Sequence, residues 1–161
     1  MSTGTFHSTP IHAIREWPGC FPAEELQCVS ANRSVRADRS RIFQAITVPE
    51  YMEAWFSAPG SIPGQTRVLG DDNSFSICGP TEHGSSFRIS CTYSVHRRSK
   101  LIFTWNKYPF PEGTASTVRI RLQGDFGRTN VDVRHTGIKP FERKWCELLW
   151  ESSLEKLSRL F

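Results

Sequence analysis

The stretch HTGIKPFERKWCELLWESSLEKLSRLF, residues 135–161, predicts a polar turn that leads into one long helix. Pro140 suits a first helical position, because its fixed φ is already helical and its missing N–H costs nothing there. Glu142 lies in the first turn and Lys156 and Arg159 lie in the last, which is the charge order that a helix dipole favours. We therefore expect residues 141–160 to be helical.

The apolar surface of this helix is wider than a surface helix needs. At about 100° per residue, polar side chains gather on one side of the helix. The apolar ones spread over the remaining arc: Phe141, Trp145, Cys146, Leu148, Leu149, Trp150, Leu154, Leu157, Leu160 and Phe161. An isolated helix cannot bury such a surface. The rest of the chain is therefore expected to supply a concave apolar partner.

Six segments of alternating apolar and polar residues precede the helix, and their alternation predicts strands. They cover residues 65–69, 74–77, 86–95, 100–105, 118–122 and 130–134. Short polar or glycine-bearing turns separate them. This spacing indicates antiparallel hairpins with one face in water.

A further strand and two short helices are expected before these hairpins. Residues 28–36 alternate weakly, Asp38 is placed to cap a helix over 39–47, and Pro49 opens a helix over 49–56. Residues 1–27 read as an N-terminal extension, partly disordered or packed on the surface. The predicted domain, residues 28–161, is α+β: a β-α-α-β6-α curved antiparallel sheet that the long C-terminal helix closes over.

Composition excludes several classes of protein. The chain has 161 residues, 20 Lys and Arg against 16 Asp and Glu, and a formal net charge of +4. The basic residues are not interleaved with aromatic ones in the pattern of a nucleic-acid site. No apolar run approaches the ~18 residues of a membrane span, and no signal peptide is visible at the start. The 5 cysteines show no metal-ligand spacing, so reduced thiols and a cytoplasmic location are expected.

Motifs spread over the domain are similar to those of one family. Residues 33–37 and 42–47 resemble its first strand and "V-W-x-A-L-T" helix, and residues 49–56 resemble "P-E-x-L-x-x-W-F". Residues 100–105 resemble "R-L-V-F-T-W", residues 116–118 match "S-T-V-T", and residues 135–137 match "H-x-G". Trp150 and the leucines after it resemble "G-W-x-x-x-L-x-x-L". From about residue 28 to 161 the chain thus resembles the bacterial relatives of the C-terminal domain of the activator of Hsp90 ATPase.

That family belongs to the START-like (SRPBCC), helix-grip superfamily, which includes polyketide cyclases and Bet v 1-type proteins. The resemblance implies a helix-grip fold and an apolar cavity between the sheet and the terminal helix. This chain departs from the family pattern at two places. Gly70-Asp71-Asp72-Asn73 replaces the usual paired-glycine turn, and Leu149 stands where a helix glycine is common.

The expected lining of the cavity comes from the inward-facing positions of the strands and helices. These are Phe56, Phe75, Ile77, Phe87, Ile89, Tyr93, Phe103, Trp105, Val118, Ile120, Trp145 and Leu149. Apolar walls with a few polar groups are typical of small-molecule sites. The alternative is that these side chains fill the core.

Three polar residues are candidates to contact a ligand. A buried phenol normally needs a hydrogen-bond partner, which makes Tyr93 one of them. His135 is the second, either as an acid or base at the end of the cavity or as a structural residue of the turn. Glu142 is the third, although its first-turn position explains it without a ligand.

Three functions remain open from sequence. The preferred one is a cytoplasmic START-like module that binds a small hydrophobic or aromatic molecule. The others are a cyclase or hydrolase that uses the same cavity, and a module that interacts with an Hsp90-type chaperone, as the resemblance implies. No cofactor, metal, nucleic acid or membrane span is expected, and the protein is expected to be a monomer or a homodimer.

Overall fold

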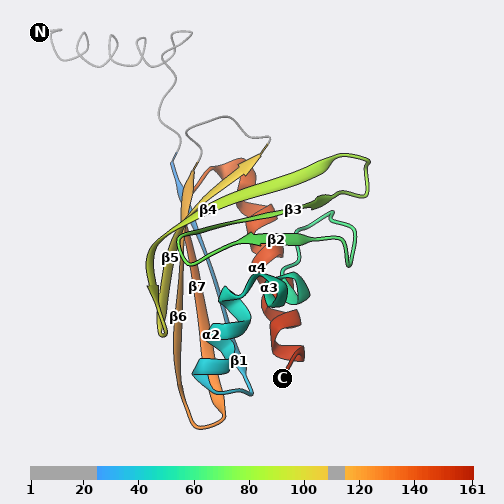
Figure 1. Cartoon of the computed structure of the whole chain (residues 1–161). Coiled ribbons are helices and arrows are strands. Elements are labelled where there is room, and N and C mark those ends of the chain that lie inside the picture. Colours follow the sequence, from blue (N-terminus) through green and yellow to red (C-terminus); the bar gives the residue numbers. More distant parts are fainter. Residues whose placement is uncertain (1–24, 109–114) are drawn as a thin grey trace, which may run out of the picture.

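A computed structural model describes residues 25–108 and 115–161 of the protein. Within them, three α-helices lie on one side of a curved antiparallel sheet (Figure 1). The sheet has seven strands in the order β1-β7-β6-β5-β4-β3-β2. The elements are β1 (Gln27–Val35), α2 (Arg39–Thr47), α3 (Pro49–Trp55), β2 (Arg67–Gly70), β3 (Ser74–Pro80), β4 (Ser86–Arg97), β5 (Lys100–Tyr108), β6 (Ser116–Asp125), β7 (Arg128–Ile138), a 3-10 turn (Pro140–Glu142) and α4 (Arg143–Arg159).

The predicted order of elements is confirmed, and the fold is the expected helix-grip α+β arrangement. The alternation in residues 86–95 correctly put Phe87, Ile89 and Cys91 on the buried face of β4. The first 24 residues, most of the predicted N-terminal extension, lie outside the described residues.

The predicted polar turn at residues 135–137 is wrong, because this stretch continues strand β7. His135 pairs with Val29 on one side and with Val118 on the other. Its side chain follows Val131 and Val133 in pointing into the core, where it is 0% exposed. Alternation of the backbone therefore continues past the last apolar residue, and a polar side chain occupies an inward position.

Two expectations about helix ends also change. Asp38 stands at the N-cap position of α2, but its side chain makes no capping hydrogen bond. Its Oδ1 atom instead accepts a hydrogen bond of 2.7 Å from the backbone N–H of Gly127, in the turn between β6 and β7. Pro140 begins the 3-10 turn rather than α4, which starts three residues later.

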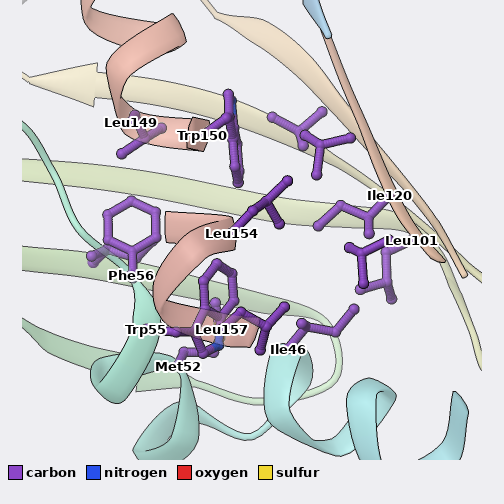
Figure 2. Packing of buried hydrophobic residues seen from close by; sticks show 14 of the residues in the cluster. Ile46, Met52, Trp55, Phe56, Leu101, Ile120, Leu149, Trp150, Leu154 and Leu157 are labelled. Atoms are coloured by element: carbon purple, nitrogen blue, oxygen red, sulfur yellow. The ribbon is translucent and has the colours of Figure 1, made fainter. Parts of the chain in front are cut away.

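Helix α4 lies across the concave face of the sheet and buries Cys146, Leu149, Trp150, Ser153, Leu154 and Leu157. Figure 2 shows Leu149, Trp150, Leu154 and Leu157 projecting into the layer that also holds Ile46 of α2, Trp55 of α3 and Phe56, which follows α3. Arg143 secures the start of α4, since its Nη1 atom donates to Gln27 Oε1 at 3.2 Å and to the Cys28 carbonyl at 3.0 Å. None of the described helices is long and apolar enough to cross a membrane.

Candidate functional site

The space between the sheet and α4 is apolar and almost filled. Six of the residues predicted to line it do so: Phe56, Phe75, Ile77, Phe103, Trp105 and Ile120. Ile46, Met52, Trp55 and Trp150 complete the wall. The enclosed volume is about 10 Å³. That is room for roughly one water molecule, so in this conformation the side chains fill the space.

Aromatic rings account for most of this filling. The ring centroid of Trp105 lies 6.0 Å from that of Phe56 and 5.6 Å from that of Trp150. Phe75 packs edge-on against Phe103 at 5.2 Å. The indole N–H of Trp55 donates to the carbonyl of Ala45 at 2.8 Å, so that polar group is satisfied inside the core. Aromatic ring pairs of this kind each contribute about 0.5–1.5 kcal/mol of stability in addition to the contribution of the apolar area that they bury.

The other predicted lining residues take several positions around this space. Phe87, Ile89, Val118 and Leu149 are buried in the same core but do not border the enclosed volume. Tyr93 is half-buried at the edge, where its ring lies 5.2 Å from Phe75. Burial raises the pKa of the Tyr93 phenol above its usual range, and the charges of Cys91 and Asp72 act in the same direction. Tyr93 is therefore neutral at physiological pH.

His135 is held by hydrogen bonds on both ring nitrogens. The indole N–H of Trp150 donates to Nδ1 at 3.1 Å, and Nε2 lies 2.7 Å from the hydroxyl of Ser116. Because Nδ1 accepts, the proton of the neutral ring is on Nε2, which then donates to Ser116. Burial lowers the pKa of His135 from 6.5 to about 3. His135 is thus neutral at physiological pH and forms part of the core.

A polar group of the same face was missed from sequence. Lys107 follows Phe103 and Trp105 at alternate positions of β5, and its Nζ lies 3.5 Å from the centroid of the Trp145 ring. Burial lowers the pKa of Lys107, while the charge of Glu142 acts against that shift. Burial raises the pKa of Glu142, and the charge of Lys107 opposes it. Extending the period-two pattern of β5 by one step would have identified this cation.

Cys146 is a third titratable group near Lys107 and Glu142. Its thiol is buried beside Lys107 and Glu142. Burial raises the pKa of Cys146 to about 12, with a further increase from the charge of Glu142. Since the thiolate is the reactive form, Cys146 is not an activated nucleophile at neutral pH.

Phe56 borders both the enclosed space and a concavity on the surface. The concavity has a volume of about 380 Å³ and lies over the connection between α3 and β2. Its lining includes Glu53, Ala54, Ser57, Thr66 and Lys156, together with Phe56. Phe56 also borders the space under α4. The two volumes are thus adjacent at this residue.

Comparison with known proteins identifies a family and several solved structures that are similar to this chain. A family model described as "Activator of Hsp90 ATPase homolog 1-like protein" matches residues 36–161. Among solved structures, protein CV1439 from Chromobacterium violaceum is similar, with a TM-score of 0.71 and 17% identity over 83% of this chain and 96% of that one. No curated protein matches the chain.

Two further solved structures are similar to the chain. CalU16 from Micromonospora echinospora has a TM-score of 0.62 and 18% identity, covering 86% of this chain and 78% of its own. DynU16 is described as a protein in the dynemicin biosynthetic locus, and it has a TM-score of 0.61 and 19% identity. That match covers 86% of this chain but 47% of DynU16. At these identities the likeness establishes the fold.

Proposed function

The chain belongs to the activator of Hsp90 ATPase homolog 1-like family, and from this premise we propose that its domain binds a small apolar or aromatic molecule between the sheet and α4. The observation that carries the proposal is the position of Phe56. This residue borders both the enclosed aromatic space and the surface concavity of about 380 Å³. Displacement of Phe56 from its packed position would join the two into one site.

The joined site would have the character of a small-molecule pocket. Ligand sites commonly have volumes of roughly 300–1,000 Å³ and apolar walls with a few polar groups. Here the inner wall is aromatic and aliphatic, and the outer part adds Glu53, Ser57 and Thr66. A planar aromatic ligand would replace the contacts that Phe56 makes with Trp105 and Trp55. Moving Phe56 out of its packed position costs free energy, so only a fraction of the molecules is open at any time. The apparent affinity for the ligand equals the intrinsic affinity of the open form multiplied by that fraction.

The enzymatic alternative would have to use Lys107 and Glu142, whose pKa values burial shifts, because His135 and Cys146 do not support it. His135 has both ring nitrogens engaged in hydrogen bonds, and burial lowers its pKa to about 3, so it is neutral at neutral pH. Cys146 is a protonated thiol. The chaperone alternative rests on the family description.

A melting-temperature screen tests the proposal. We expect at least one of naringenin, dodecanoate and deoxycholate to stabilise the protein, as these represent aromatic, fatty-acid and sterol-like ligands. At about a hundredfold excess over the dissociation constant, linkage contributes about 2.7 kcal/mol, which corresponds to a rise of roughly 5–10 °C. Tryptophan fluorescence should change in parallel, because Trp55, Trp105 and Trp150 border the space.

Phe56→Leu sharpens the test. The smaller side chain makes opening easier, so we expect this variant to bind the same compound more tightly than the wild type. Phe161→Leu is the matched control, because Phe161 borders a separate groove against Arg41 and Tyr51. The proposal is wrong if no compound shifts the melting temperature of either the wild type or Phe56→Leu. Stimulation of an Hsp90 ATPase by the protein would then be the next assay.

A further inference from the structure

A basic concavity lies at the opposite end of the sheet from the start of α4. It has a volume of about 480 Å³. Its lining comes from the turn between β4 and β5, the end of β6 and the first residue of α2: Arg39, Ser99, Lys100, Arg121, Leu122, Gln123 and Gly124. Lys100 and Arg121 alternate with the buried Leu101 and Leu122 and therefore point to the outer face of the sheet, whereas Arg39 comes from α2 on the concave side. The concavity thus lies at the end of the sheet, where α2 begins beside the end of β6. This concavity is separate from the space under α4 and does not depend on the function proposed for it.

Positively charged residues are paired directly opposite one another on the neighbouring strands beside this concavity. Arg97 of β4 pairs with Lys100 of β5, and Lys100 pairs with Arg121 of β6. Like charges at directly opposed positions destabilise a sheet. Arg39 adds a third positive charge to the concavity itself. The backbone therefore holds together charges that repel one another.

The same pattern continues along the sheet. Arg119 of β6 is opposite Arg134 of β7, and the Nε of Arg119 is buried without a hydrogen-bond partner. Asp132 of β7 is opposite Arg121 and offsets part of the charge. Among the described residues, none of these cations forms an ion pair with a carboxylate. A negative charge from outside the chain would relieve the repulsion.

We propose that this concavity binds the phosphate group of a small phosphorylated molecule. A phosphate carries about two negative charges and several acceptor oxygens, which suits a cluster of three cations better than a monovalent carboxylate does. Guanidinium groups such as those of Arg39 and Arg121 bind phosphate through two parallel hydrogen bonds. The hydroxyl of Ser99 and the amide of Gln123 are further donors at the rim. The volume is in the range of small-molecule sites, which favours a metabolite over an extended polyanion.

The test uses inorganic pyrophosphate and isothermal titration calorimetry at low ionic strength. We expect binding to the wild-type protein and a loss of affinity of about tenfold or more in Lys100→Gln/Arg121→Gln, because the substitutions remove two cationic donors of charge-assisted hydrogen bonds to the phosphate. The double variant Arg88→Gln/Lys144→Gln removes the same net charge from exposed positions elsewhere. It should bind pyrophosphate about as well as the wild type.

A second measurement separates a folding defect from a binding defect. Lys100→Gln/Arg121→Gln should melt at the same temperature as the wild type or higher, because the substitution removes a repulsion. The proposal fails if pyrophosphate binds both double variants equally. It also fails if a single-stranded DNA oligomer binds the wild type more tightly than pyrophosphate and loses that affinity in Lys100→Gln/Arg121→Gln, since the face would then be a nucleic-acid surface.

Discussion

Replacing Trp150 with alanine is expected to lower the free energy of unfolding by about 3–5 kcal/mol, the range for large aromatic truncations in a core. Trp150 is 1% exposed and packs against Trp105 at a centroid distance of 5.6 Å. Its indole N–H also donates to His135, so the substitution leaves a buried imidazole nitrogen without its donor. Both effects act in the same direction.

A guanidinium titration measures this loss, with Trp145→Ala as the matched control. Trp145 is on the same helix but half-buried, packed beside the Lys107 ammonium group. Trp145→Ala should therefore cost clearly less than Trp150→Ala. A loss below about 1 kcal/mol for Trp150→Ala would contradict the packing described here, because that is the range of exposed positions.

The second large effect is an acid-induced loss of stability that depends on His135. In the unfolded chain the histidine takes up a proton near its ordinary pKa of 6.5, whereas in the folded protein burial delays protonation to about pH 3. Between these values the unfolded state binds more protons, so stability rises with pH and is lost as pH falls. The slope is about 1.4 kcal/mol per pH unit, which gives a loss of about 2 kcal/mol between pH 7 and pH 5.

Urea titrations of the wild type and His135→Gln at several pH values check this expectation. Glutamine does not titrate, so its variant should lose about 2 kcal/mol less than the wild type between pH 7 and pH 5. Identical pH dependence in the wild type and His135→Gln would show that His135 is accessible to protons in the folded state.

Much of the fold could be predicted because its signals are local. The alternation in β4 and the wide apolar arc of α4 determine which side chains are buried, whatever the details of packing. The error at His135 has a physical origin. A histidine followed by Thr136 and Gly137 has the composition of a turn, and only the pairing with Val29 and Val118 shows that the strand continues. Pairing between distant strands is not visible in a local pattern.

The residues around the enclosed space were predicted in part from sequence. Whether that space is open or filled by side chains could not be predicted. Alternation identified Phe75, Ile77 and Phe103 as inward-facing, and the structure places them around the enclosed space. Whether such residues enclose a cavity or fill it depends on the rotamers of Phe56, Trp105 and Trp150, which the sequence pattern does not specify. Lys107 was missed because the apolar run ends at Trp105, although the strand continues to Tyr108.

The measurement that tests the central proposal most directly is the location of a bound ligand by methyl NMR. The compound that gives the largest rise in melting temperature among naringenin, dodecanoate and deoxycholate would be added to methyl-labelled protein. The proposal predicts intermolecular nuclear Overhauser effects from its protons to the methyl groups of Ile46, Ile77 and Ile120, which border the space between the sheet and α4. Effects confined to Leu160 and Ala54, in the groove beside Phe161, would contradict it.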